Sequence, residues 1–105
     1  MSKNIPQSVK VIVIGGGVAG CSCAYHLAKF GWKDTILLER DQLTSGTTWH
    51  AAGLIGQLGA SQTITKIRKY SLDLYKQLEK ETGLSTGLKQ NGAITVASSK
   101  DRMQE

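Results

Sequence analysis

The feature that most constrains the fold is a run of three glycines directly after a short apolar segment. Residues 10–14 read Lys-Val-Ile-Val-Ile, and residues 15–20 read Gly-Gly-Gly-Val-Ala-Gly. A β-branched apolar run of this length is typical of a strand that is buried on both faces of a parallel sheet. The glycines end that strand, and we expect a helix over residues 18–30 with Gly31 as its C-terminal stop.

A second apolar segment completes a strand-helix-strand unit. Residues 35–39 (Thr-Ile-Leu-Leu-Glu) predict another buried strand, so the unit spans residues 9–40. About 30 residues is the length expected for a right-handed parallel crossover. The sequence therefore predicts an α/β fold that begins with a Rossmann-like β-α-β unit.

The spacing of three of the glycines predicts a dinucleotide site. In this pattern Gly15 permits a tight turn, Gly17 lets the backbone approach a diphosphate, and Gly20 lets the helix pack closely. The start of the helix offers unpaired N–H groups and the positive end of its dipole. Glu39 lies 19 residues after Gly20, where its carboxylate can accept both ribose hydroxyls, which disfavours NADP. The alternative is a glycine turn that serves packing alone.

The rest of the chain predicts a long loop, a helix and one more strand. Residues 43–61 are dense in Gly, Ser and Thr and too long for an ordinary connection, which indicates a functional loop. A helix follows over residues 62–82 and Gly83 closes it, with one apolar face made of Ile64, Ile67, Ser71, Leu74, Tyr75 and Leu78.

Residues 92–97 alternate like a strand, and Ser99 resembles a helix N-cap. Two parallel strands under one helix leave a sheet face and both edges open. We therefore expect residues 1–105 to be the N-terminal part of a larger protein, with the remainder of the domain missing.

Composition argues against several classes of partner. The net charge is +5, but the basic residues are scattered and no aromatic side chains alternate with them, so no nucleic acid is expected. Cys21 and Cys23 diverge on a helix, which makes a disulfide or a zinc site poor and core packing the simpler role. No apolar run approaches the roughly 18 residues of a membrane span. Residues 1–10 lack a secretory signal.

The segment after Glu39 carries a family resemblance. Glu39 and Arg40 are followed by residues 43–54, Leu-Thr-Ser-Gly-Thr-Thr-Trp-His-Ala-Ala-Gly-Leu. This segment resembles the start of the sarcosine and dimethylglycine dehydrogenases, flavoproteins of the D-amino-acid-oxidase-like superfamily. The similarity continues through residues 81–84, 86–87, 90–92 and 97–98. In that family the T-W-H-A/T-A-G-L segment carries a histidine bonded to the 8α-methyl carbon of FAD, so the resemblance implies FAD, attached covalently through His50.

The cofactor contacts that the motif and the resemblance imply fall into three groups. The diphosphate would lie on the glycine turn, the adenosine end on Glu39 and Arg40, and the flavin along the loop. These contacts would be made by Gly15, Gly17, Val18, Ala19, Gly20, Glu39, Arg40, Ser45, Gly46, Thr47, Thr48, Trp49, His50, Ala51, Ala52, Gly53 and Leu54.

The residues of the loop suit this role without the family name. Small hydroxyl and glycine residues keep bulk away from a large planar ring, and a neutral imidazole is a competent nucleophile. From the residues alone a structural loop histidine is the simpler interpretation of His50, and His26, inside the first helix, is also most simply structural. No substrate-contacting or catalytic residue is identifiable in this segment.

The resemblance also implies an activity for the full-length protein. That activity is FAD-dependent oxidative demethylation of an N-methylated amino acid, sarcosine or dimethylglycine, by hydride transfer to the flavin. Water or tetrahydrofolate would capture the imine, and an electron-transfer flavoprotein or oxygen would accept the electrons. The compartment would be the cytoplasm in a bacterium and the mitochondrial matrix in a eukaryote. The alternatives are a non-catalytic regulatory relative or another FAD-dependent amine or amino-acid oxidase, and this chain alone is expected to be inactive.

Overall fold

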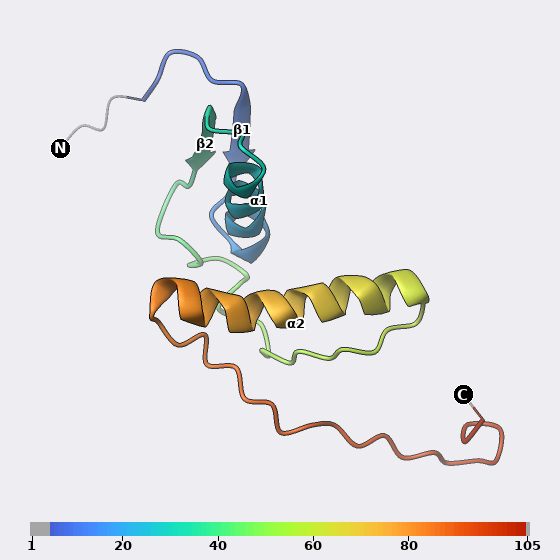
Figure 1. Cartoon of the computed structure of the whole chain (residues 1–105). Coiled ribbons are helices and arrows are strands. Elements are labelled where there is room, and N and C mark those ends of the chain that lie inside the picture. The colour runs from blue at the N-terminus through green and yellow to red at the C-terminus, as the bar shows by residue number, and fades with distance from the viewer. Residues whose placement is uncertain (1–4, 105) are drawn as a thin grey trace. The chain divides into compact units, whose positions relative to one another are not determined.

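The computed structural model describes residues 5–104, and Figure 1 shows their elements in chain order. These are β1 (Val11–Ile14), α1 (Val18–Lys29), β2 (Thr35–Leu38) and α2 (Gln62–Thr82). The chain divides into two compact units, Met1–Ala52 and Gly53–Glu105, which are described separately. The prediction about a secretory signal concerns residues 1–10, and residues 1–4 of that segment lie outside the described residues.

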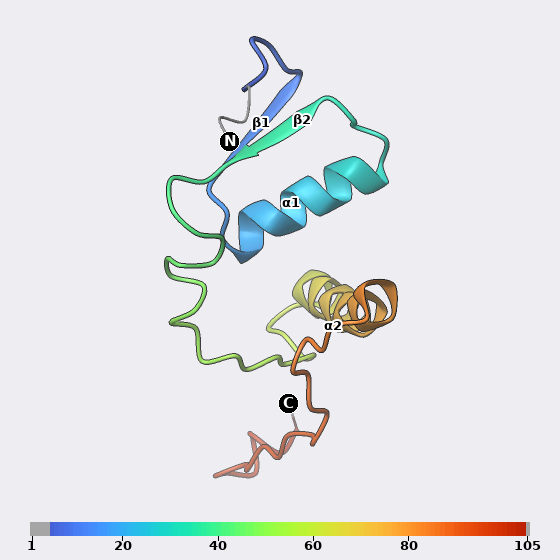
Figure 2. The ribbon, with the colours of Figure 1, turned by 90° about the vertical axis from the view of Figure 1, so that its left-hand side faces the viewer.

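The first unit is the predicted β-α-β unit. β1 and β2 pair in parallel with Val11 opposite Thr35 and Ile14 opposite Leu38, and α1 packs on this pair (Figure 2). The predicted fold class is thus confirmed. The expected burial of β1 on both faces is wrong, because α1 covers one face and no other element of the unit covers the second. Ile12 and Ile14 point to that second face and are 54% and 85% exposed.

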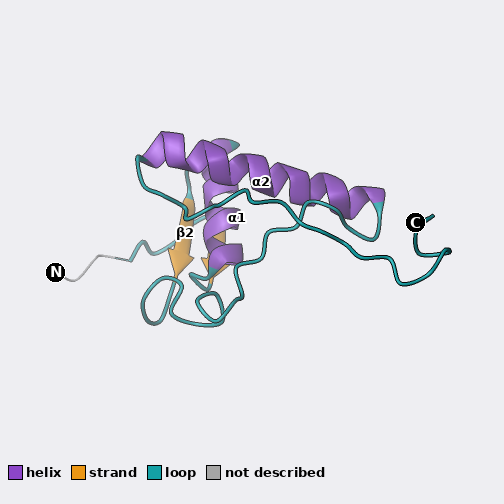
Figure 3. Cartoon of the chain, turned by 90° about the horizontal axis from the view of Figure 1, so that it is seen from below, coloured by secondary structure: helices purple, strands orange, loops and turns teal. Residues whose placement is uncertain are grey.

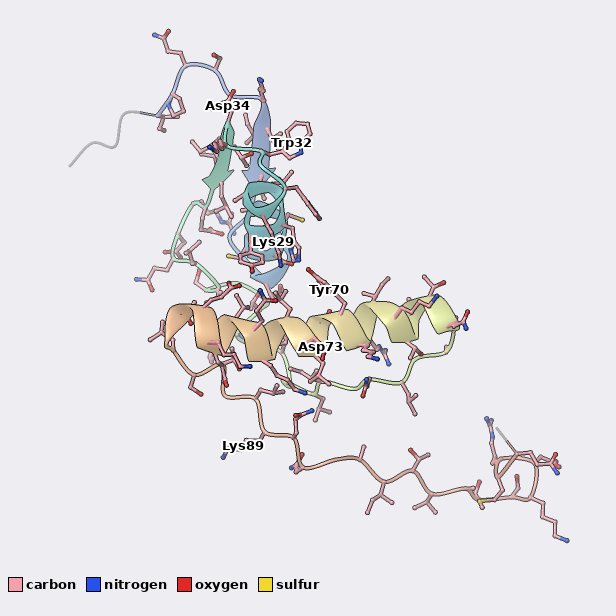
Figure 4. The ribbon with its side chains drawn as sticks, in the orientation of Figure 1. Lys29, Trp32, Asp34, Tyr70, Asp73 and Lys89 are labelled. Carbon is pink, nitrogen blue, oxygen red and sulfur yellow. The ribbon has the colours of Figure 1, made fainter. Side chains whose placement is uncertain are left out.

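The end of α1 follows the predicted stop. Gly31 has φ +86°, a left-handed conformation that glycine adopts without strain, and its N–H donates to the carbonyl of Ala28 at 3.0 Å. The turn that follows carries Trp32 and Asp34, both labelled in Figure 4. One carboxylate oxygen of Asp34 accepts the N–H of Lys10 at 3.2 Å, which ties this turn to the start of β1.

The second unit contains α2, whose bounds match the prediction. Gly83 follows it with φ 69°, and its N–H donates to the carbonyl of Glu79 at 3.0 Å. The predicted apolar face is partly wrong. The buried residue of α2 is Leu72, which the pattern left out, whereas Ile64 and Ile67 are 42% and 57% exposed.

The strand predicted over residues 92–97 is absent from the structure. Figure 3 shows the described chain after α2 as a loop, and Ile94 and Val96 are 94% and 85% exposed. An alternating pattern becomes a strand only when a neighbouring strand accepts its backbone hydrogen bonds, and this segment has no such neighbour among residues 5–104. Ser99 does start a turn, because its hydroxyl accepts the N–H of Arg102 at 3.3 Å.

The N-cap of α2 gives a testable stability prediction. The hydroxyl of Ser61 accepts the N–H of Ile64 at 3.3 Å, which satisfies one of the unpaired amides of the first turn. Replacing Ser61 with alanine should lower the free energy of unfolding by about 1 kcal/mol. Thermal unfolding followed by circular dichroism measures the loss, and Ser61→Thr should restore most of it. An alanine variant as stable as the wild type would contradict the capping role.

Candidate cofactor-binding site

The glycine turn has the geometry that the motif requires. Gly15 has φ +100°, and its N–H donates to the carbonyl of Leu38 at 2.8 Å, so the turn folds back onto β2. A Cβ atom on Gly20 would lie 1.8 Å from the carbonyl oxygen of Gly15, a separation that no side chain can occupy. The structural roles predicted for Gly15 and Gly20 are confirmed. Gly20 makes its closest approach to the turn itself, and Val13 on β1 lies farther away at 3.5 Å.

Gly16 is the centre of this turn, although the motif does not demand a glycine there. It is buried, its N–H donates to Glu39 Oε2 at 2.7 Å, and its carbonyl accepts the N–H of Thr44 at 2.9 Å. A Cβ atom on Gly16 would lie 2.5 Å from Cδ2 of Leu43 and 3.1 Å from Cβ of Glu39. Sequence analysis did not place Gly16 in the site. The available signal was a fourth glycine in a motif that requires three.

Glu39 ties the end of β2 to the glycine turn. Its Oε2 accepts the N–H of Gly16, and its Oε1 accepts the N–H of Asp41 at 3.0 Å. The hydrogen bond from Gly16, followed by that from Asp41, lowers the pKa of the carboxyl from its ordinary value of 4.5. A carboxylate has about four lone-pair positions. Glu39 therefore retains acceptor capacity for ribose hydroxyls beside the two amides that it already holds.

The lowered pKa of Glu39 gives a pH prediction. A carboxyl with a lowered pKa in the folded state stabilises that state above the unfolded value of 4.5, and this contribution is lost as the pH falls through the lower, folded value. The amide resonance of Gly16 should therefore move in an acid titration with a midpoint below 4.5, and in Glu39→Gln this transition should vanish. A midpoint at or above 4.5 would show that the carboxylate does not hold the turn.

The loop after β2 is attached to the glycine turn at two points. The N–H of Thr44 donates to the carbonyl of Gly16, and Thr44 has a left-handed φ of 66°. The hydroxyl of Thr48 accepts the N–H of Val18, the first residue of α1, at 3.0 Å. Figure 2 shows this loop passing the N-terminal end of α1. The structure thus brings the first half of the loop together with the glycine turn.

His50 lies two residues beyond the second attachment point. Its Nδ1 is 3.0 Å from the carbonyl oxygen of Gly46, and its ring stacks at a tilt of 45° on Trp49, with 4.4 Å between the ring centroids. The imidazole is exposed, so its other ring nitrogen is accessible. The hydroxyl of Ser45 is engaged within the loop, because it donates to the carbonyl of Gln42 at 2.8 Å.

Two of the predicted contacts lie outside this arrangement. Gly53 and Leu54 belong to the second compact unit, and Leu54 is 91% exposed. The side chain of Arg40 is exposed beside Glu39. The roles predicted for Gly53, Leu54 and Arg40 toward the cofactor stay predictions, as do those of the residues on the loop.

The turn fits the diphosphate of a dinucleotide. Within residues 5–104, the N–H groups of Gly17 and Ala19 have no hydrogen-bond acceptor, and both lie at the positive end of α1. Gly17 adds no side chain to block them, whereas the amide of Val18 is already bonded to Thr48. The described residues contain no cluster of His, Cys, Asp or Glu suited to a metal ion. No helix among them is long and apolar enough to cross a membrane.

Comparison with known proteins gives the family. Residues 10–105 match the family described as FAD dependent oxidoreductase. The chain is 47% identical over 105 residues to human mitochondrial sarcosine dehydrogenase, and the match covers 99% of this chain and 11% of that protein. It is 46% identical over 96 residues to rat mitochondrial dimethylglycine dehydrogenase, covering 91% of this chain and 11% of that protein.

A relative of a different kind is almost as similar. The mitochondrial pyruvate dehydrogenase phosphatase regulatory subunit of the mouse is 42% identical over 99 residues, covering 94% of this chain and 11% of that protein. The chain thus spans about a tenth of the length of these relatives. The family match covers nearly all of the described residues, including the glycine turn and the loop. The chain therefore belongs to the FAD-dependent oxidoreductase family.

Proposed function

We propose that this chain is the cofactor-binding part of an enzyme that oxidatively demethylates an N-methylated amino acid, sarcosine or dimethylglycine. The observation that carries the proposal is the attachment of the His50 loop to the glycine turn through Thr44 and Thr48. This arrangement supports a diphosphate on the turn and a flavin along the loop. The identity to sarcosine and dimethylglycine dehydrogenases supports the substrate class.

In the proposed mechanism the flavin would carry out the redox step, and the protein would bind and orient it. A bound FAD would supply the acceptor for a hydride from the N-methyl carbon of the substrate, which would become an imine. The amides of Gly17 and Ala19 hold the diphosphate, and Glu39 holds the ribose. We propose water or tetrahydrofolate as the acceptor of the one-carbon unit, and an electron-transfer flavoprotein or oxygen as the acceptor of electrons. The compartment proposed is the mitochondrial matrix in a eukaryote and the cytoplasm in a bacterium.

We further propose that His50 attaches the flavin covalently. A carbonyl oxygen can only accept a hydrogen bond, so Nδ1 of His50 must donate its proton to Gly46. In the neutral ring the lone pair then lies on Nε2. Nε2 is therefore the nitrogen that this geometry leaves available for a bond to the 8α-methyl carbon of the flavin. That bond would replace one C–H bond of the methyl group: the proton would pass to solvent, and the electron pair would remain on the flavin ring until the proposed electron acceptor removed it.

A second candidate function is that of a regulatory relative without catalysis. The observation that favours it is the 42% identity to the regulatory subunit of pyruvate dehydrogenase phosphatase, which is close to the identity shared with the dehydrogenases. Similarity within this segment alone therefore does not separate the two functions. The retained histidine at position 50 in a loop attached to an open diphosphate turn favours the flavoenzyme.

One experiment on the full-length protein separates these functions. The purified protein is precipitated with acid, and flavin is quantified in the pellet and in the supernatant. Flavin in the pellet together with sarcosine- or dimethylglycine-dependent reduction of an artificial electron acceptor supports the enzyme with a covalent cofactor. Flavin only in the supernatant overturns the covalent attachment, and a protein without any flavin supports the regulatory function. Glycine, which lacks the N-methyl group, is the matched negative substrate.

A further inference from the structure

We propose that Thr48 is a positioning residue that fixes the loop carrying His50 on the first residue of α1. The inference rests on the proposed attachment of flavin to His50 and adds the device that places this histidine. The hydroxyl of Thr48 accepts the N–H of Val18 at 3.0 Å across 30 residues of sequence. Gly17, the N-cap residue of α1, has no side chain to make this bond, so a residue of the loop supplies the cap.

The approach of Thr48 depends on the glycine turn. A Cβ atom on Gly17 would lie 2.9 Å from Oγ1 of Thr48, closer than real Cβ contacts come. Thr48 is half-buried, whereas the neighbouring loop residues on both sides are exposed. The hydroxyl thus occupies a place that the glycine leaves open. The same glycine that admits a diphosphate also admits the side chain that anchors the loop.

The anchor controls the part of the loop that contains the histidine. Thr44 attaches the beginning of the loop to Gly16, and Thr48 attaches its middle to Val18. Beyond Thr48, the N–H of Ala51 returns to the carbonyl of Thr48 at 3.2 Å, so His50 lies inside a turn that starts at the anchor. Loss of the Thr48 hydroxyl would leave Thr44 in place and release the turn that bears His50.

The hydroxyl also retains a proton for a ligand. Because Oγ1 of Thr48 accepts a bond from Val18, its O–H remains available to donate, and the described residues offer it no acceptor. The unpaired amides of Gly17 and Ala19 lie at the same end of α1. A diphosphate oxygen is an acceptor suited to all three groups, so binding of the diphosphate and placement of His50 act through one side chain.

The test measures covalent attachment in the full-length protein. Apoprotein is mixed with FAD, and the rate at which flavin becomes acid-precipitable is recorded separately from the total flavin bound. Thr48→Val should slow attachment by about 100-fold, the scale on which a misplaced reacting group slows a reaction. Thr48→Ser, which keeps the hydroxyl, should stay within about threefold of the wild type, and Thr63→Val on the exposed face of α2 is the matched control.

A second variant removes the same hydrogen bond by deleting its donor, the N–H of Val18. Val18 is the first residue of α1, a position where proline is tolerated, so Val18→Pro deletes the N–H and preserves the helix start. It should slow attachment because it removes the same anchor, and by no more than Thr48→Val, which also removes the hydroxyl that would donate to the diphosphate. The double variant should be no slower than Thr48→Val alone. This variant also carries the test if Thr48→Val does not fold.

Three results would overturn the inference. They are attachment at the wild-type rate in Thr48→Val, equal loss in Thr48→Ser, or additive losses in the double variant. A wild-type protein that never attaches flavin would instead remove the proposed role of His50 on which the inference rests. A wild type that attaches flavin, with Thr48→Val equally fast, refutes the positioning role alone.

Discussion

Replacing Gly20 with alanine is expected to lower the free energy of unfolding by at least about 3 kcal/mol, the upper part of the range for overpacking, and to abolish FAD binding. The new Cβ would lie 1.8 Å from the carbonyl oxygen of Gly15, which is backbone and cannot rotate away. Relief requires α1 to move off the turn, and that movement separates the amides of Gly17 and Ala19 from the diphosphate position. Urea unfolding and FAD titration of the full-length protein measure the two effects.

The matched control is Gly56→Ala. A Cβ on Gly56 would meet no atom within 4 Å, and its backbone is not in the left-handed region. We expect this variant to lie within about 0.5 kcal/mol of the wild type, as surface substitutions generally do. If Gly20→Ala were as stable as Gly56→Ala and bound FAD normally, the close packing of turn and helix would not be a requirement of the site.

Replacing His50 with alanine is expected to change the flavin from entirely covalent to entirely dissociable. The imidazole is the nucleophile in the proposed attachment, whereas the proposed diphosphate and ribose contacts belong to the glycine turn and Glu39, which are held together without His50. The variant should therefore still bind FAD, and acid should release all of it. Flavin fluorescence of the denatured protein band on a gel, together with the flavin content of the acid supernatant, measures the change.

His26→Ala is the control for this substitution. His26 lies within α1, and its Nδ1 contacts the carbonyl of Ser22 at 2.7 Å, so it makes a local bond on the helix. This variant should retain covalent flavin. Covalent flavin that persists in His50→Ala would place the attachment on another residue, and its loss in both variants would point to a general loss of folding.

The parts of the fold that the sequence predicted correctly are those that local chemistry determines. Gly31 and Gly83 adopt positive φ values where each helix ends, and the apolar segments at residues 10–14 and 35–39 pair as strands. The strand predicted over residues 92–97 failed because its pattern needs a partner strand. Leu72 was missed because burial in α2 depends on which side of the helix the neighbouring segments cover, and helical spacing does not contain that information.

The same distinction applies to the candidate site. The spacing of Gly15, Gly17 and Gly20 predicted the turn, because each occupies a position where a positive φ or a close contact disfavours a side chain. The bond from Val18 to Thr48 joins residues 30 positions apart, and the bond from Gly16 to Glu39 joins residues 23 positions apart. No sequence spacing specifies such pairs. Their geometry follows only once the parallel pairing of β1 and β2 has brought the loop back to the turn.

The uncovered face of β1 has a consequence for how the protein reaches its native state. Val11 and Thr35 pair in parallel across 24 residues of sequence, and parallel strand pairing is slow because the intervening chain must first be ordered. During that interval Ile12 and Ile14 present an apolar strand surface to solvent. Such transient surfaces attract other chains and molecular chaperones. The yield of active protein should therefore depend on how quickly this surface is covered during synthesis.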